Sequence, residues 1–369
     1  MAGATDRAGR PGLEWPGWPG EAPDLLDAVD AEMRRQVDAA EAEAPPGAAV
    51  APFHGMLRYH LGWADADLAP TRADGGKRLR PLLLLRCAEA HGGPAAARAA
   101  VPAAAAVELL HNFTLVHDDI QDQSSHRRHR ETVWQLWGPA QAINVGDALF
   151  AIAHAALYRL AEPPGVVEPA RVLAIAHDFD RVALRIVEGQ YLDLAQEGRW
   201  GGGIARYLAT IEGKTAAIMA FAAWAGAALA GADGETADRF GRFGCALGLA
   251  FQVRDDILGI WGAPEVTGKP AADDLRRRKQ SLPVVALDEA APPAARAELR
   301  ALYAAPRLDE AGVARILALL DAAGVQATCQ AYVARYHDEA RAALDELPPH
   351  RARTEHLHDF LEALEERVV

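Results

Sequence analysis

The sequence predicts an all-α fold, a single-domain helical bundle. After Pro23, apolar residues recur three and four positions apart along almost the whole chain, which is the pattern of helices that bury one face. Alanine is abundant, as in the run 103–106, and it has the highest intrinsic preference for helix. No convincing stretch alternates apolar and polar residues as a half-buried strand does. We therefore expect roughly ten or more helices and no second domain.

Breaks rich in proline and glycine separate the predicted helices. Residues 1–22 carry three prolines among glycines, so we expect a disordered N-terminal tail followed by one domain over residues 23–369. The internal breaks are Pro45-Pro46-Gly47, Gly92-Gly93-Pro94, Pro163-Pro164-Gly165, Gly201-Gly202-Gly203 and Pro292-Pro293. Such clusters end helices because glycine and proline fit helix interiors poorly.

Composition excludes several classes of function. The net charge of -13 argues against nucleic acid as the main partner. No apolar run reaches the roughly 18 residues that a membrane span needs, so we expect no stable membrane insertion, and the N-terminus lacks a signal-peptide pattern. Cys87, Cys245 and Cys329 are scattered, with no CxxC pair, and indicate reduced thiols of a cytoplasmic protein.

Two acidic clusters carry the main chemical signal, Asp118-Asp119-Ile-Gln-Asp122 and Asp255-Asp256-Ile-Leu-Gly259. Helix residues four apart lie about 40° apart around the axis, one turn above each other. If the two clusters oppose each other across a bundle, they present five carboxylates to one cavity. Such a charge is costly to bury without cations, and Mg²⁺ with oxygen ligands and substrate phosphates fits it. Either cluster alone is explained equally well as a solvated helix face.

A basic segment precedes the first cluster. In Gly75-Gly76-Lys77-Arg78-Leu79-Arg80-Pro81, the side chains of Lys77 and Arg80 are three residues apart and share a face if a helix has begun. A fixed cationic pair suits a diphosphate. By itself the segment is explained equally well as a basic loop at a helix terminus.

Further basic residues follow the same cluster. Arg127, Arg128 and Arg130 begin five residues after Asp122, close enough to fold over the same cavity. His111 lies seven residues before Asp118 and therefore below it on the same helix face. The histidines at 117 and 129 have no such reason to be singled out and are expected to be structural.

The second half of the chain offers cations around the second cluster. Gly213-Lys214-Thr215 is too short for a phosphate-binding loop, since no GxxxxGK pattern precedes it. Gln252 stands just before Asp255, and Lys269 and Lys279 follow. Cations therefore flank both acidic clusters, as expected if metal ions and diphosphates lie between them.

The ordered motifs GGKRLRP, LLHNFTLVHDDIQD, GQYLD, GKT, FQVRDDILG and GK resemble the trans-isoprenyl diphosphate synthase (polyprenyl synthetase) family over about residues 70 to 285. Several motifs in the correct order are more specific than either aspartate cluster alone. The resemblance implies a helical bundle of the isoprenoid synthase type with a central active-site cavity, Mg²⁺ as cofactor and a homodimer. It also implies a trans-prenyltransferase that condenses isopentenyl diphosphate with an allylic diphosphate.

The resemblance also implies roles for individual residues. Magnesium would be held by Asp118, Asp122 and Asp255, supported by Asp119 and Asp256. The allylic diphosphate would be bound by Arg127, Lys214, Thr215 and Lys269, with Gln252 nearby. Isopentenyl diphosphate would be bound by Lys77, Arg80, His111 and Arg128. Asp118, Asp122, Asp255 and Lys214 are the implied catalytic residues, and Lys279 is a weaker match than Lys269.

One position departs from the family pattern. The second cluster of the family often ends in a third aspartate, where this chain has Gly259. A metal ligand or supporting acid is therefore missing. Because Asp255 carries most of the metal contact of that motif in the family, we expect altered affinity rather than loss of activity.

Residues upstream of Asp118 are expected to set product length. At 1.5 Å rise per residue, Thr114 and Phe113 lie roughly 6 to 7.5 Å below it and Leu110 about 12 Å below. In the family, a bulky aromatic at the fifth upstream position resembles synthases that stop at geranylgeranyl diphosphate, and small Thr114 argues against a farnesyl stop. Phe113 also lies about 140° from Asp118 around the helix, so packing on a neighbouring helix is the alternative.

Geranylgeranyl diphosphate is therefore the expected product, with farnesyl or a longer prenyl diphosphate as alternatives. A terpene cyclase on the same scaffold would ionise one diphosphate but would not need the second, isopentenyl pocket. A non-catalytic subunit of a heteromeric synthase would be expected to lose an aspartate cluster, whereas this chain keeps both.

Overall fold

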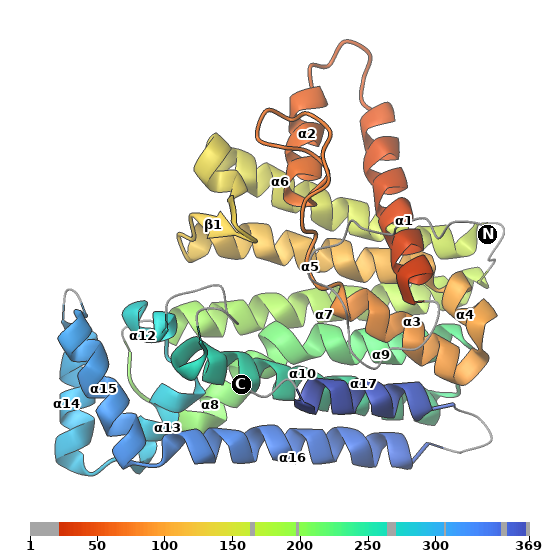
Figure 1. The fold of residues 1–369 in the computed structure, drawn as a ribbon. Coiled ribbons are helices and arrows are strands. Elements are labelled where there is room, and N and C mark those ends of the chain that lie inside the picture. The colour runs from red at the N-terminus through yellow and green to blue at the C-terminus, as the bar shows by residue number, and fades with distance from the viewer. Residues whose placement is uncertain are drawn as a thin grey trace, which may run out of the picture.

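The computed structural model describes residues 22–162, 167–196, 199–263, 271–305, 308–347 and 353–366, and helices account for most of them (Figure 1). The all-α expectation is confirmed. The predicted tail falls outside the described residues except for Ala22, where the first helix begins. In the part that is described, the strands are β1 (His126–Arg127) and β2 (Arg130–Glu131), a short antiparallel hairpin in which Arg127 pairs with Arg130.

The helices of the first half are α1 (Ala22–Ala42), α2 (Ala51–His60), α3 (Leu79–Gly92), α4 (Pro94–Ala99), α5 (Val101–Gln121), α6 (Val133–Tyr158), η1 (Arg159–Ala161) and α7 (Pro169–Gln196). Those of the second half are α8 (Gly203–Ile211), η2 (Glu212–Ala216), α9 (Ala217–Leu229), α10 (Gly234–Trp261), α12 (Asp273–Arg276), α13 (Leu282–Ala290), α14 (Pro293–Ala304), α15 (Glu310–Ala322), α16 (Val325–Asp345) and α17 (Glu355–Glu366).

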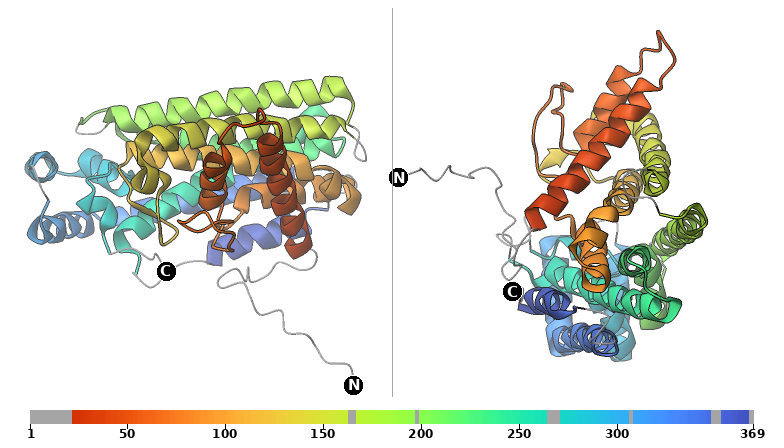
Figure 2. Two further views of the ribbon diagram at one scale, coloured as in Figure 1. Left: turned by 90° about the horizontal axis from the view of Figure 1, so that it is seen from above. Right: turned by 90° about the vertical axis from the view of Figure 1, so that its right-hand side faces the viewer.

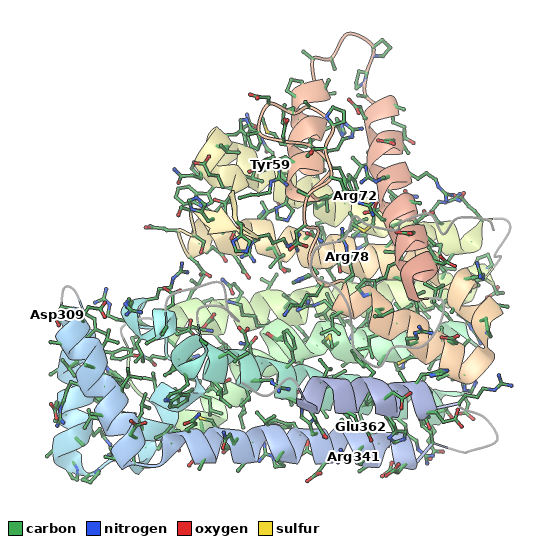
Figure 3. All side chains as sticks on the ribbon, in the orientation of Figure 1. Tyr59, Arg72, Arg78, Asp309, Arg341 and Glu362 are labelled. Carbon is green, nitrogen blue, oxygen red and sulfur yellow. The ribbon has the colours of Figure 1, made fainter. Side chains whose placement is uncertain are left out.

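The predicted breaks coincide with helix boundaries wherever the structure describes them. Gly93 has φ of 79° between α3 and α4, and Gly202 has φ of 86° before α8, both in the region that favours glycine. The break at residues 163–165 lies outside the described residues. Side-chain caps start other helices: Asp233 accepts a hydrogen bond from the Thr236 amide at 2.9 Å, and Asp309 (labelled in Figure 3) caps α15 in the same way.

The long helices α5, α7, α9, α10 and α16 run roughly side by side, while α1 and α2 form a hairpin that projects from this bundle (Figures 1 and 2). Glycines allow the closest crossings. A Cβ atom on Gly226 of α9 would lie 2.1 Å from the carbonyl oxygen of Leu84 in α3, and one on Gly244 of α10 would lie 2.4 Å from that of Met219 in α9. Glycines therefore lie at these two helix contacts.

Among the described residues, the helical segment Val133–Ala161 is long and apolar enough to cross a membrane, judged by length and composition alone. Its mean hydropathy is 1.2. No segment of this kind was expected from the sequence. A core helix of a bundle meets the same criteria, and α6 packs along α5 in this fold.

Candidate active site

A cavity of about 260 Å³ lies between α5, α7, η2 and α10. Its lining collects side chains from five of the sequence motifs. The predicted site residues among them are Arg80, His111, Thr114, Asp118, Arg127, Lys214, Thr215, Gln252 and Asp255. Asp256 and Lys279 also line it. The two acidic clusters therefore share one cavity, as the sequence predicts.

In the first cluster the two adjacent aspartates have different roles. Asp118 lines the cavity, whereas Asp119 is buried and is not part of the lining. The Asp119 carboxylate accepts hydrogen bonds from Arg127, from Nε at 2.9 Å and from Nη2 at 2.7 Å. Since neighbouring helix residues point about 100° apart, one aspartate can face the cavity while the next holds the arginine beside it. Asp119 thereby fixes the guanidinium of Arg127 at the cavity wall.

The second cluster repeats this arrangement. Asp255 is exposed at the cavity, and Asp256 is almost fully buried behind it. Four donors reach the Asp256 carboxylate: Tyr207 Oη at 2.7 Å, Gln252 Nε2 at 3.0 Å, Lys279 Nζ at 3.2 Å and the Leu282 amide at 3.1 Å. A buried carboxylate with this many donors is a structural anchor. Asp256 therefore holds Lys279 as Asp119 holds Arg127.

The expectation that five carboxylates face one cavity is wrong in detail. Asp118, Asp255 and Asp256 line it, but Asp119 does not, because it is buried and holds Arg127. Asp122 is exposed at the C-cap of α5 and is not part of the lining either.

Lys214 reaches the cavity through a distorted helix turn. Residues Glu212–Ala216 form a π-helical turn, a feature that is frequent at functional sites. Gly189 of α7 permits it, because a Cβ atom there would lie 2.2 Å from the backbone nitrogen of Lys214. The Lys214 ammonium donates to Asp193 at 2.7 Å, and Thr215 Oγ1 donates to Gln252 at 2.8 Å. The turn thus carries a cation to the wall opposite Asp118.

Burial dominates the electrostatics of Asp118. Burial raises the pKa of Asp118 to about 6, against the attraction of Lys214, and nearby Asp122 adds to the rise. In the described residues no three His, Cys, Asp or Glu side chains converge closely enough to hold a metal ion alone. Carboxylate oxygens are nonetheless the donors that Mg²⁺ prefers, and it usually takes one or two of them together with substrate phosphates. The donor chemistry fits magnesium that is completed by a substrate.

A second group of basic side chains, Arg80, His111 and Arg128, contributes Arg80 and His111 to the cavity lining. Arg80 donates from Nη1 to Nε2 of His111 at 3.1 Å, so this ring nitrogen must be an acceptor. Burial lowers the pKa of His111 well below its usual value, with Arg80 and Arg128 adding to the effect, which keeps the ring neutral. Arg80 Nε and Arg128 Nη1 are buried and have no partner among the described residues. Unpaired buried cationic donors are costly, and a bound anion would satisfy them.

Within the Gly75–Pro81 segment, Lys77 does not share a helix face with Arg80 as predicted. Helix α3 begins at Leu79, so Lys77 precedes the helix, is exposed and is not in the cavity lining, whereas Arg80 is. Gly76 has φ of 90°, and Nη2 of Arg128 lies 2.7 Å from the position of a Cβ atom there. The absence of a side chain at 76 thus gives Arg128 its place. Arg78 (Figure 3) is structural and pairs with buried Glu108 at 2.7 Å.

Lys269 lies outside the described residues, and Lys279 takes a larger part than its weak motif match indicated. Burial acts to lower the pKa of the Lys279 ammonium, but Asp256, Asp274 and Asp255 together raise it, so the group stays charged. The position of Lys279 results from the fold around Asp256. No motif near Lys279 in the sequence reveals this position.

The three candidate chain-length residues lie in different surroundings. Thr114 lines the cavity, and Leu110 is fully buried in the core. The ring of Phe113 lies 5.1 Å from Phe150 of α6 and 4.8 Å from His117, measured between ring centroids. Phe113 is not in the cavity lining, so it occupies the alternative position that the helical wheel allowed.

Sequence reasoning gave no role to several lining residues, among them Asp193, Gln196 and Tyr207. A signal existed for the first two, because Gly189, Asp193 and Gln196 recur at helical spacing on one face of α7. Tyr207 has no comparable signal, since its partner Asp256 is far away in the sequence.

Comparisons with known proteins agree with this geometry. A family model described as polyprenyl synthetase matches residues 67–320. A (2E,6E)-farnesyl diphosphate synthase of Mycobacterium tuberculosis is 45% identical over 229 residues, which cover 62% of this chain and 61% of that protein. A geranylgeranyl diphosphate synthase of the same species is 43% identical over 274 residues, covering 74% of this chain and 76% of that protein.

The fold is shared as well. The crystal structure of a polyprenyl synthetase from Streptomyces coelicolor A3(2) matches with a TM-score of 0.81 and 37% identity, covering 95% of this chain and all of that one. Since the family model spans well over half of the 369 residues and the solved structure covers nearly the whole chain, the chain belongs to the polyprenyl synthetase family of trans-isoprenyl diphosphate synthases.

Proposed function

We propose that the protein is a magnesium-dependent trans-prenyltransferase that joins isopentenyl diphosphate to an allylic diphosphate. The observation that carries the proposal is the presence of two cationic groups at one cavity. In the first, Arg127 and Lys214 stand with Asp118 and Asp255 in the lining. The second consists of Arg80 and Arg128, each of which has a buried guanidinium nitrogen without a partner among the described residues. Two cationic groups match two diphosphate substrates, of which the allylic one must lose its diphosphate.

In this proposal the side chains of the first cationic group stabilise the leaving group. Arg127 and Lys214 are fixed by Asp119 and Asp193 and offer positive charge to the allylic diphosphate as its C–O bond breaks. Magnesium ions bound at Asp118, Asp122 and Asp255 would supply further positive charge to the same diphosphate. The apolar side chains of Leu115, Ile186 and Ile218 in the lining limit access of water to the allylic cation.

The second cationic group positions the other substrate. With its diphosphate held by Arg80 and Arg128, the double bond of isopentenyl diphosphate attacks the allylic carbon, and the new C–C bond forms with that electron pair. A proton is then lost from the adjacent carbon to the released diphosphate, which leaves a trans double bond. No covalent nucleophile is needed, and Cys87 and Cys329 are buried with burial raising the pKa of each thiol.

We further propose geranylgeranyl diphosphate as the main product. The uninterrupted first cluster and the small side chain of Thr114 in the cavity lining support a chain longer than farnesyl. Related enzymes carry names of both the farnesyl and the geranylgeranyl type, so product analysis has to decide.

The free cysteines support a reducing, cytoplasmic location.

The outer face of α6 and α7 supports a homodimer. Six large apolar side chains are exposed there: Ile143, Tyr158, Leu173, Leu184, Val187 and Tyr191. A surface hollow of about 680 Å³ lined by Leu184, Phe221 and Trp224 continues this face. Exposed apolar patches of this kind mark association surfaces, and a second copy presents the same patch in a symmetric dimer.

The first test concerns the cavity aspartates. Asp118→Asn or Asp255→Asn should lower turnover by about 10²-fold or more, because each removes negative charge that binds the metal opposite the leaving group. Steady-state rates with saturating Mg²⁺ measure the effect, with the exposed Asp321→Asn as control. Activity that persists after chelation of divalent ions, or near-normal turnover in a folded variant, contradicts the mechanism.

The second test separates the two diphosphate sites. Arg80→Ala should mainly raise KM for isopentenyl diphosphate, because it removes a charge-assisted contact to one substrate. Arg72→Ala serves as the control, since Arg72 (Figure 3) is exposed in the loop before the same segment. A rise in KM for the allylic primer alone would mean that the two sites are assigned in reverse.

The third test concerns product length. Phe113→Ala should lengthen the products by at least one isoprene unit if Phe113 limits the space for the growing chain. Thr114→Phe should shorten them because Thr114 lines the cavity. Chromatography of the dephosphorylated products from the wild type and both variants measures the distribution. Unchanged products from Phe113→Ala together with shorter ones from Thr114→Phe would mean that Thr114, and not Phe113, limits product length.

The fourth test concerns assembly. Light scattering of the purified protein should give the mass of two chains, and Leu184→Glu should reduce it towards one, since a charge buried in an apolar interface is costly. Ala301→Glu introduces the same charge on the exposed surface of α14 and should leave the mass unchanged. A wild-type mass of one chain at micromolar concentration excludes the dimer.

A further inference from the structure

The β1–β2 hairpin contains two of the basic residues of the site, Arg127 and Arg128. Because Arg127 pairs with Arg130, the turn consists of Arg128 and His129, which have φ of 51° and 61°. Two-residue turns with positive φ at both positions favour asparagine and glycine. Arginine and histidine in these places cost conformational free energy, so contacts outside the turn must compensate for it.

Arg130, the residue after the turn, binds the C-terminal end of α2. It donates from Nη1 to the carbonyl oxygen of Tyr59 at 3.0 Å and from Nη2 to that of Ala64 at 2.6 Å. Its guanidinium carbon also lies 3.9 Å from the centroid of the Tyr59 ring. A cation is favoured over an aromatic ring and at the C-terminal end of a helix. Arg130 therefore attaches the hairpin to α2.

Tyr59 (labelled in Figure 3) makes the same connection in the opposite direction. Its Oη donates to the carbonyl oxygen of Glu131 at 2.8 Å. The side chain is buried, and its ring packs edge-on against Trp137 of α6, with the ring centroids 5.0 Å apart. Close packing of this kind holds the hydroxyl in a fixed place. Hydrogen bonds in both directions thus join α2 to the hairpin.

A small cavity lies between the turn and the end of α2. Its volume is about 20 Å³, and residues of both segments line it, among them His60 and Arg128. Side chains do not fill this space, so packing alone does not fix the turn against α2. Tyr59 and Arg130 also line the cavity, and their hydrogen bonds set the distance between the two segments.

The two arginines of the hairpin depend on this connection to different degrees. Arg127 has an anchor of its own, because buried Asp119 accepts hydrogen bonds from its guanidinium at 2.7 and 2.9 Å. Nη1 of Arg128, in contrast, is buried without a partner among the described residues. The position of Arg128 therefore follows the backbone of the turn more closely than that of Arg127 does.

We propose that Tyr59 and Arg130 are positioning residues for isopentenyl diphosphate. They hold the hairpin so that Arg128 is in place to bind this substrate together with Arg80, and they affect the allylic site at Arg127 much less. The proposal rests on the proposed function, in which Arg80 and Arg128 bind isopentenyl diphosphate. It also separates the members of the basic run, since Arg127 and Arg128 meet substrate whereas Arg130 meets α2.

Calorimetric titration of the full chain with isopentenyl diphosphate, in the absence of an allylic primer, tests this role. Arg130→Met keeps an unbranched side chain and removes the charge and the donors, and it should raise Kd about 10-fold because Arg128 is no longer held in place. Arg130→Lys should recover part of the loss, because it returns a cation to the Tyr59 ring. Arg58→Met on α2 is the matched control, since Arg58 pairs with Asp38 at 2.7 Å, and it should leave Kd unchanged.

Steady-state kinetics give a readout that a merely structural role would not change. In Arg130→Met, KM for isopentenyl diphosphate should rise about 10-fold, while kcat and KM for the allylic primer stay within about threefold of the wild type. General destabilisation would instead lower the apparent kcat without separating the two substrates. Tyr59→Phe removes only the donor to Glu131, so it should raise KM for isopentenyl diphosphate by a smaller factor, and it decides the test if Arg130→Met does not fold.

The proposal is overturned if these variants, once folded, bind isopentenyl diphosphate as tightly as Arg58→Met does, or if KM rises equally for both substrates. A wild-type protein that binds isopentenyl diphosphate but elongates no primer would contradict the proposed function and leave the positioning role standing. A wild-type protein that elongates primers while Arg130→Met and Tyr59→Phe keep its affinity would contradict the positioning role alone.

Discussion

The site depends on one repeated interaction, a buried aspartate that holds a cation beside an aspartate that faces the cavity. Asp119 holds Arg127 on one wall, and Asp256 holds Lys279 on the other. Both anchors are buried, so each pair is poorly screened by solvent. Burying a carboxylate without its donors costs several kcal/mol of folding free energy. The folded state is therefore stable only when the surrounding loops place their cations next to it. The positions of Arg127 and Lys279 at the cavity follow from these two anchors.

This constraint explains why the loops after each cluster are built as they are. Arg127 can reach back to Asp119 because the chain reverses in the β1–β2 hairpin, where Arg128 takes a positive φ of 51°. On the other wall, the chain returns after α10 so that the amide of Leu282 and the ammonium of Lys279 both meet Asp256. Strained backbone positions of this kind persist when the surrounding contacts compensate for their cost.

A second constraint is the close approach of helices without side chains between them. Gly189 lets η2 touch α7, and only through this contact does Lys214 reach Asp193 and the cavity. Gly259 has the same effect at the second cluster, where it leaves room for the carboxylate of Asp274. In both places a missing Cβ atom allows a charged group from another segment to enter. The geometry of the charges is therefore set by packing as much as by the motifs.

The sequence by itself determined the helical class, most helix boundaries and the two acidic faces, because these depend on periodicity and on local backbone preferences. It also predicted that Asp118 and Asp255 share one cavity, since two matching acidic clusters are costly to bury without shared cations. Tertiary structure alone decided which neighbouring segments complete the site. It brought Asp193 and Lys279 into the cavity lining, left Lys77 exposed and packed Phe113 against Phe150. The physical reason is that direction around one helix is local, whereas the distance between helices depends on every side chain packed between them.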